Sequence, residues 1–316
     1  MEYRNLGKAG VKVSRICLGT AFRGLGDEKT CTRVIERAMD LGCNFIDCAN
    51  YYGRGRSETI LGKALKGKRD DIVLTTKVQS AMGDGANDRG LSRFHIMREV
   101  ERSLMRLQTD HIDIYLLHHF DAETPLEETL KTMDDLVRQG KVRYVACCNF
   151  RAWQLVRALW VSDAHSLEPF VCLQSRYNLL GRREIEDDLM PVCRTFGLGM
   201  MTYSPLAVGL LTGRFRRGQP PPPDTPWGKR QYDFEKTMDA QADAVVRKLI
   251  DIGQARDRTP AQVAIAWILD HEEITAPIIG PDLPEHVDEV FGALDWQLDS
   301  EERAALDEVS QWGTTP

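Results

Sequence analysis

The 316-residue sequence lacks the features that would mark a membrane, secreted or nucleic-acid-binding protein. No apolar run approaches the roughly 18 residues that a membrane-spanning helix needs. The opening residues, MEYRNLGKAG, lack the charged-then-apolar pattern of a secretory signal. No run of basic residues is long enough for a nucleic-acid footprint, and Arg214, Arg216 and Arg217 form only a small cluster. We therefore expect a cytoplasmic protein with neither a membrane nor a nucleic-acid partner.

The sequence also lacks a paired cysteine motif. Its eight cysteines contain no C-x-x-C pair, and most of them fall inside apolar runs. Buried thiols in a reducing compartment explain this distribution better than a disulfide framework does. A redox-sensing pair formed by Cys147 and Cys148 is the alternative interpretation.

Short apolar runs alternate with longer amphipathic runs along the chain. Each apolar run is short enough to be a strand and apolar enough to be buried on both faces. The expected strands are residues 14–20, 44–49, 72–78, 112–118, 142–148, 170–175, 200–204 and 275–280. The stretches between them carry apolar residues at helical spacing. Strands that alternate with helices, at a repeat of roughly 30 to 40 residues, predict a parallel (β/α)₈ TIM barrel. We expect one domain over residues 1–316.

A doubly wound sheet is the alternative architecture. Such a sheet normally carries a G-x-G-x-x-G phosphate turn after its first strand. Here the first strand runs into residues 19–24, GTAFRG, which lack that pattern. The partial match Gly53-Arg54-Gly55 is better explained as a turn before a helix that Ser57 caps.

Three segments lie outside the barrel repeat. Residues 2–13 contain two glycines and are expected to form a hairpin across the barrel bottom. Residues 211–240 hold five prolines without an obvious element, and a loop of this length is usually functional. A disordered insertion is the alternative for this loop. Residues 284–293 and 300–309 are expected to form C-terminal closing helices.

Ionisable residues follow three neighbouring predicted strands. Asp47 lies near the end of the second strand and Tyr52 follows it, Lys77 lies near the end of the third, and His118 ends the fourth. The C-terminal ends of barrel strands meet at one rim, where barrel enzymes place their chemistry. A lone charge in such apolar surroundings costs several kcal/mol, so we expect these groups to pair.

A general-acid mechanism follows from this grouping. Tyrosine has an ordinary pKa near 10, and a nearby Lys77 ammonium is expected to lower the pKa of Tyr52. Asp47 would keep Lys77 charged, and His118 would hydrogen-bond the substrate oxygen. None of these groups carries a hydride, so a redox cofactor is required.

Simpler explanations exist for the single residues. Asp47 and Lys77 alone could be a structural ion pair, and Tyr52 alone an ordinary half-buried ring. His118 beside His119 could suggest a metal pair, but neighbours on a strand point to opposite faces. No third ligand has a sensible spacing, so we expect no metal.

Several motifs together resemble the aldo-keto reductase family, and the similarity runs from about residue 3 to the end. The first is FIDCANYYG at residues 45–53, followed by Ser57-Glu58 and LGKAL at residues 61–65. The others are GKVRYV at 140–145, CNF at 148–150, Gln174 with Tyr177-Asn178, YSPL at 203–206 and GLLTGR at 209–214. The long 211–240 loop resembles the branch with bacterial general-stress reductases and potassium-channel β subunits.

The resemblance implies reduction of aldehydes or ketones with NADPH. It places the family's catalytic tetrad on Asp47, Tyr52, Lys77 and His118. It implies that Tyr203 stacks on the nicotinamide and that Cys148, Asn149 and Gln174 hold the carboxamide. The whole cofactor set expected from it is Gly19, Thr20, Cys148, Asn149, Gln174, Tyr203, Ser204, Pro205, Leu206, Gly209, Leu211, Arg214, Gly280, Asp282 and His286.

Two positions depart from the family pattern. Cys148 stands where the family usually has serine, and a thiol is a weaker hydrogen-bond partner. Asp282 stands near the adenosine end, where it would repel a 2′-phosphate and could accept from ribose hydroxyls. Arg214, Arg216 or Arg217 could still bind that phosphate. NADP(H) is therefore slightly favoured, with NAD(H) as the alternative.

The substrate cannot be assigned from the sequence, because loops after the strands set it. Candidate substrate residues are Phe22, His119, Trp153 and Trp227, with Phe120 and Met82 as further candidates. Two other functions compete with carbonyl reduction. One is a cofactor-binding regulatory subunit with little turnover, and the other is an aldolase that forms a Schiff base on Lys77.

Overall fold

The protein folds as a closed barrel of parallel strands, which a computed structural model describes over residues 1–22 and 27–312. The barrel order is β10-β3-β4-β5-β6-β7-β8-β9. The strands are β3 (Cys17–Gly19), β4 (Phe45–Asp47), β5 (Val73–Val78), β6 (Ile112–Leu117), β7 (Val142–Cys148), β8 (Cys172–Arg176), β9 (Gly199–Tyr203) and β10 (Ile274–Ile279). Because β10 pairs with β3, the sheet has no free edge, which confirms the (β/α)₈ barrel and excludes the doubly wound sheet.

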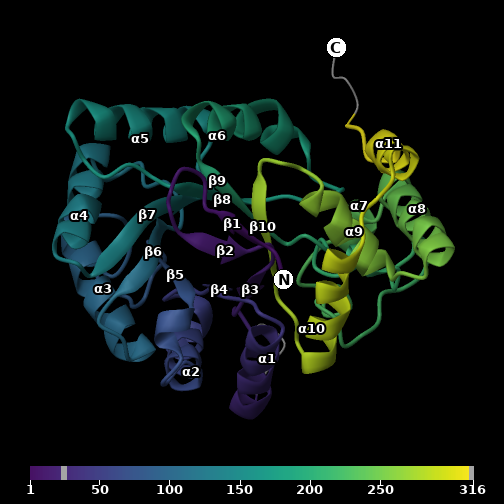
Figure 1. The fold of residues 1–316 in the computed structure, drawn as a ribbon, viewed down its shortest axis with the longest axis horizontal. Helices are drawn as coiled ribbons and strands as arrows, with labels where there is room; N and C mark the ends of the chain where they lie inside the picture. The colour runs from purple at the N-terminus through teal and green to yellow at the C-terminus, as the bar shows by residue number, and fades with distance from the viewer. Residues whose placement is uncertain (23–26, 313–316) are drawn as a thin grey trace.

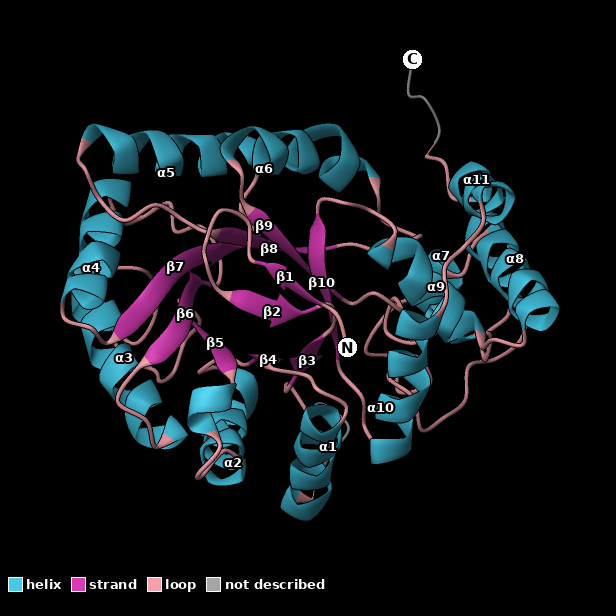
Figure 2. Ribbon diagram, viewed as in Figure 1, coloured by secondary structure: helices cyan, strands magenta, loops and turns pink. Residues whose placement is uncertain are grey.

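Helices surround the strands on the outside, as Figure 1 and Figure 2 show. The longer helices are α1 (Glu28–Asp40), α2 (Arg56–Ala64), α3 (Arg93–Leu107), α4 (Leu126–Arg138), α5 (Ala152–Ala164), α6 (Met190–Phe196), α8 (Ala240–Arg256) and α9 (Pro260–Leu269). The predicted closing helices are α10 (Pro284–Phe291) and α11 (Ser300–Val309). Short turns are η1 (Tyr52–Gly55), η2 (Arg69–Asp71), η3 (Ile185–Leu189), η4 (Leu210–Thr212), α7 (Phe234–Thr237) and η5 (Gly292–Asp295).

The predicted N-terminal hairpin is present and covers the start of the barrel strands. Strands β1 (Tyr3–Asn5) and β2 (Lys12–Ser14) pair antiparallel, and Figure 1 shows them in front of the barrel. Gly7, in the turn, has a φ of 57° and lies against the start of β9. A Cβ there would come within 2.3 Å of the Gly199 nitrogen, so both the turn and the contact require glycine.

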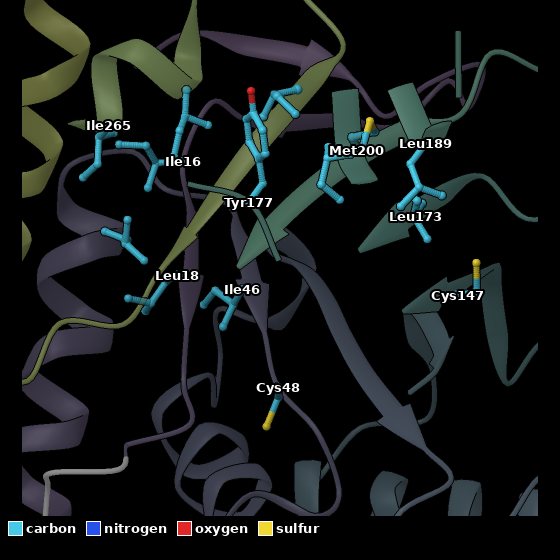
Figure 3. Close-up of a cluster of buried hydrophobic side chains, with 14 of the residues drawn as sticks. Ile16, Leu18, Ile46, Cys48, Cys147, Leu173, Tyr177, Leu189, Met200 and Ile265 are labelled. Carbon is cyan, nitrogen blue, oxygen red and sulfur yellow. The ribbon is translucent and has the colours of Figure 1, made fainter. Parts of the chain in front are cut away.

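Apolar residues fill two layers, one inside the barrel and one between barrel and helices. Alternate residues of each strand serve the two layers: Phe45 lies in the inner cluster and Ile46 in the outer one. Figure 3 shows part of the outer cluster, with Ile46, Leu173 and Met200 among its labelled members. All eight cysteines are free and buried, as predicted. Burial raises the pKa of Cys147 and Cys148, which favours plain thiols over a redox pair.

The 211–240 segment packs on the barrel through side chains of its own. Arg216 donates to Asp243 of α8 at 2.8 Å, and Trp227 donates from Nε1 to the Val208 oxygen at 2.9 Å. Trp227 is only 4% exposed and contacts Tyr232 and Phe234. The indole therefore packs this loop, and a role of Trp227 at the substrate stays a prediction.

Among residues 1–22 and 27–312, no helix has both the length and the apolar character needed to cross a membrane.

Candidate active site

The predicted tetrad comes together at the C-terminal rim of the barrel. Asp47 is the last residue of β4, Lys77 lies near the end of β5, and His118 follows β6. Asp47 and Thr75 are register partners, so Lys77, two residues beyond Thr75, shares their inward face. Tyr52 begins the η1 turn after β4, and its hydroxyl lies 3.3 Å from Lys77 Nζ.

Asp47 and Lys77 form a buried ion pair. Lys77 is fully buried and Asp47 is 2% exposed. The Lys77 Nζ donates to both Asp47 oxygens and to the Cys48 carbonyl, each at 2.7 Å. Burial acts to lower the pKa of Lys77, but Asp47 and Tyr52 outweigh it and leave that pKa raised. The lysine is therefore an ammonium at neutral pH.

Tyr52 completes the pair into a chain of three groups. Lys77 Nζ lies 3.3 Å from the Tyr52 hydroxyl and 5.0 Å from the centroid of its ring. Burial raises the pKa of Tyr52 to about 12, and the opposing effect of Lys77 is smaller. The predicted net lowering of this pKa was wrong because burial outweighs the charge. The phenol is consequently protonated at neutral pH.

His118 faces Tyr52 across the rim, with ring centroids 6.1 Å apart. Burial, followed by the charge of Lys77, lowers the pKa of His118 to about 3, so the imidazole is neutral. Its Nδ1 is buried and has no hydrogen-bond partner among the described residues. His119 stacks on it at 5.0 Å, contrary to the prediction that the two rings point apart. The strand ends at Leu117, so strand alternation does not reach either histidine.

The four residues predicted to hold a nicotinamide lie beside the tetrad. Gln174 donates from its amide nitrogen to Asp47 at 2.8 Å and accepts from the Cys148 thiol at 3.4 Å. Asn149 donates to the Cys148 sulfur at 3.1 Å, accepts from the Tyr203 hydroxyl at 2.8 Å and has a φ of 59°. These side chains therefore form one hydrogen-bonded row leading from Asp47 to Tyr203.

The chain after β9 adopts a left-handed backbone that suits an anion. Ser204, Ala207, Val208 and Gly209 all have φ between 49° and 88°. Strained residues of this kind cluster at binding sites, and successive amides in such turns can form an anion-binding concavity. Pro205 is buried here and Leu206 is half-buried. The backbone at the predicted cofactor residues Ser204 and Gly209 thus has a shape suited to an anion.

Other predicted cofactor residues have structural roles. The Thr20 hydroxyl donates to the Asp47 carbonyl at 2.9 Å and lies 3.0 Å from the Ser57 hydroxyl. A Cβ at Gly19 would lie 2.8 Å from Ile278, so packing against β10 requires glycine. The Leu211 side chain is fully buried in the core, which leaves only its backbone available to a cofactor.

The residues expected to lie near the adenosine of the coenzyme are exposed to solvent. Gly280, Asp282 and His286 are exposed around the start of α10. Arg214 is exposed, whereas Arg216 is paired with Asp243.

Two cavities flank the tetrad and the nicotinamide residues. A cavity of about 480 Å³ is lined by Tyr51, Tyr52 and Arg54 with three small residues. A second, of about 650 Å³, reaches from Asn149 and Tyr203 to the C-terminal Trp312.

The remaining candidate substrate residues differ in their exposure. Phe22 is half-buried against the core, Trp153 is 55% exposed and stacks edge-on with Phe120, and Met82 lies in the loop after β5. Within the described part of the chain, no group of three or more metal-ligating side chains could hold a metal ion.

Two residues that hydrogen-bond next to the tetrad were not predicted in these roles from the sequence. Thr75 donates to Asp47 at 2.7 Å, and its position two residues before Lys77 was the available signal. Ser57 does not cap α2, since Gly55 occupies that position. Instead Ser57 is buried and donates to the Thr20 carbonyl, which ties α2 to the first barrel strand.

Comparison with known proteins identifies the family of the chain. The Aldo/keto reductase family model matches residues 15–311. "Uncharacterized oxidoreductase YrpG" of Bacillus subtilis (strain 168) is 39% identical over 330 aligned positions, covering 100% of this chain and 98% of that protein. Two proteins named "Probable voltage-gated potassium channel subunit beta", from Arabidopsis thaliana and Oryza sativa subsp. japonica, are each 34% identical, covering 93% of this chain and 92% of their own length. With its closed barrel and its match over nearly the whole chain, this protein is an oxidoreductase-type member of the aldo/keto reductase family.

Proposed function

We propose that the protein reversibly reduces an aldehyde or ketone to an alcohol with a nicotinamide coenzyme, using Tyr52 as general acid and base. One observation carries this proposal. A fully buried Lys77 ammonium contacts both a carboxylate, at 2.7 Å, and the Tyr52 hydroxyl, at 3.3 Å. Such a chain stabilises the phenolate that remains after proton transfer.

Each tetrad residue has a defined part in this reaction. A bound reduced nicotinamide would supply the hydride. Tyr52, protonated at neutral pH, donates its proton to the carbonyl oxygen of the substrate. Neutral His118 hydrogen-bonds the same oxygen and orients it. Asp47 keeps Lys77 charged, and Thr75 and Gln174 hold Asp47 in place.

The coenzyme we propose is NADP(H). The row from Gln174 to Tyr203 suits the carboxamide and ring, and the left-handed turn after Tyr203 suits the pyrophosphate. Exposed Arg214 is a candidate cation for a 2′-phosphate, while the exposed Asp282 carboxylate would repel one. Fluorescence titration with NADPH and with NADH compares the Kd values of the two coenzymes. Tighter binding of NADPH is expected, and tighter binding of NADH would assign the selectivity to Asp282.

The geometry argues against an aldolase. A Schiff base requires a neutral amine, but Asp47 holds Lys77 as an ammonium that donates hydrogen bonds to three neighbouring residues. Borohydride trapping of a carbonyl substrate is expected to leave Lys77 unmodified. A covalent adduct on Lys77 would reverse this conclusion.

A regulatory subunit with little turnover is the second candidate, because two relatives are named as channel β subunits. The complete tetrad favours turnover. Coenzyme oxidation measured across a panel of neutral and charged carbonyls, in the wild type and in Tyr52→Phe, separates the two functions. Tight coenzyme binding without oxidation of any carbonyl would favour the regulatory subunit. We place the activity in the cytoplasm, on a small-molecule substrate.

A further inference from the structure

A second group of buried charges lies directly behind the tetrad, on the outer face of the barrel. Thr76 sits between Thr75 and Lys77, so its side chain points away from the active site. It donates to Glu58 of α2 at 2.6 Å, and Arg106 of α3 donates to the same carboxylate at 2.7 Å. Glu58 is fully buried.

Glu99 of α3 extends this group to the segment that carries Tyr52. It is fully buried and accepts from Arg102 at 2.8 Å and from the Asn50 amide at 3.2 Å. Asn50 is also fully buried and precedes Tyr52 by two residues. Its backbone N–H donates to the Lys77 carbonyl at 3.4 Å.

Arg106 of α3 packs on Gly55, at the other end of the segment 50–55 that carries Tyr52. A Cβ at Gly55 would lie 2.6 Å from the Arg106 Cδ, so the arginine stem packs directly on that glycine. Residues 50–55 are therefore held at both ends by α3, through Glu99 at Asn50 and through Arg106 at Gly55.

The backbone between these two contacts is in an unfavourable conformation that neighbouring residues must stabilise. Gly53, Arg54 and Gly55 have φ of 58°, 53° and 91°, three left-handed residues in succession. Left-handed conformation is unfavourable for a residue with a Cβ such as Arg54, and it persists where the surroundings fix it.

A contribution to stability alone does not explain why Glu58, Glu99 and Arg106 are charged residues at these buried or partly buried positions. Ion pairs of this kind are often replaceable by apolar side chains without loss of stability. The group also leaves Asn50 Oδ1 and the hydroxyl of fully buried Tyr115 without a partner among the described residues. An arrangement that carries unpaired polar atoms is better explained by a requirement for fixed geometry.

We propose that Asn50, Glu99 and Arg106 are positioning residues, which hold the 50–55 turn so that the Tyr52 hydroxyl stays against Lys77. This inference rests on the proposed function, in which that contact tunes proton transfer. A misplacement of about 1 Å can lower turnover by about 100-fold, so small movements of the turn are sufficient to matter.

Two substitutions loosen the turn without touching the tetrad. Asn50→Leu removes the amide that Glu99 binds, and Glu99→Met removes the acceptor. We expect kcat to fall by about 10- to 100-fold in both, with the coenzyme Kd unchanged. Glu99→Gln keeps an acceptor oxygen and is expected to restore most of the turnover.

A pH profile distinguishes positioning from a general loss of stability. The pH midpoint for alcohol oxidation reports deprotonation of Tyr52, which Lys77 favours. Loosening their contact is expected to move this midpoint upward in Asn50→Leu and Glu99→Met. The matched control is Asp134→Asn on α4, which removes a buried carboxylate that accepts from Arg138 and from the Glu168 amide. It is expected to lower stability while leaving kcat and the midpoint unchanged.

The outcomes separate the two proposals. Full turnover in Tyr52→Phe would overturn the proposed function itself. Loss of turnover in Tyr52→Phe, with kcat and pH midpoint in the loosened variants matching Asp134→Asn, would overturn the positioning role alone. Should the loosened variants not fold, Arg106→Lys keeps the charge but shortens the group packed on Gly55. An unaltered pH midpoint in that variant would equally refute the role.

Discussion

Replacing Asp47 with asparagine isolates the charge that supports the tetrad. Lys77 is fully buried, and the Asp47 carboxylate is its charged partner at 2.7 Å. Two unit charges at 2.7 Å attract by about 6 kcal/mol at an effective dielectric constant of about 20. Breaking such a pair from one side typically destabilises a protein by about 3–5 kcal/mol, because a buried charge remains. At about 2 °C per kcal/mol, the melting temperature should fall by roughly 6–10 °C.

The pH dependence of this loss identifies its cause. In the wild type the pKa of Lys77 is raised above its ordinary value, so its stabilisation is complete below pH of about 10.4 and declines only above it. In Asp47→Asn, burial acts without the carboxylate and lowers the pKa of Lys77. The unfolded variant then binds more protons than the folded one, so its stability rises with pH. The difference between wild type and variant should therefore shrink between about pH 7 and pH 10.

Thermal unfolding followed by near-ultraviolet circular dichroism measures both effects. Asp113→Asn is the matched control, because Asp113 pairs at 2.7 Å with Arg69, which stays charged throughout this range. Its stability loss should not depend on pH. A difference for Asp47→Asn that is equally constant with pH, or smaller than about 1 kcal/mol, would refute the assignment of Lys77 as a buried ammonium held by Asp47.

Three further perturbations follow from the site and from the C-terminal packing. Burial raises the pKa of Tyr52 to about 12, so kcat/KM for carbonyl reduction should show no basic limb up to about pH 10. The rate of alcohol oxidation should rise with pH over the same range. A basic limb near pH 8 in the reduction profile would contradict this. Cys148→Ser replaces a thiol, a weak hydrogen-bond partner, by a hydroxyl. It should lower the coenzyme Kd by about fivefold, or about 1 kcal/mol. An unchanged Kd in the fluorescence titration would show that this side chain does not reach the coenzyme. Arg182 is a 9% exposed residue whose guanidinium binds Glu186 at 2.7 Å and Asp307 of α11 at 3.0 Å. Arg182→Leu should lower the free energy of unfolding by about 3 kcal/mol, as measured by calorimetry. Lys63→Ala, in an exposed pair, is its control and should change stability by less than about 1 kcal/mol; equal losses would refute the packing role of Arg182.

The barrel was predictable because its strands are buried on both faces and leave clear apolar runs. Asp47, Lys77 and His118 could be grouped for the same reason, since parallel strands bring their C-terminal ends to one rim. The orientation of His119 was not predictable, because the rule of alternating faces fails where β6 ends at Leu117.

Burial and long-range contacts could not be taken from the sequence. The sign of the shift in the Tyr52 pKa depends on how fully the phenol is desolvated, which only the folded loops determine. The contact of Asn50 with Glu99 joins residues 49 positions apart, and nothing in their local pattern pairs them. Trp227 is an aromatic residue in a loop, which suggested a substrate residue, and its contacts with Val208 and Tyr232 could not be taken from the sequence.

Removing a single oxygen atom from Tyr52 tests the central claim most directly. Tyr52→Phe preserves the ring and its packing, and deletes only the hydroxyl beside Lys77. Stopped-flow or steady-state oxidation of NADPH with a reducible carbonyl should fall by about 100-fold or more, while the fluorescence titration of the coenzyme is unchanged. Turnover at the wild-type rate in this variant would show that the proton comes from elsewhere and would contradict the account.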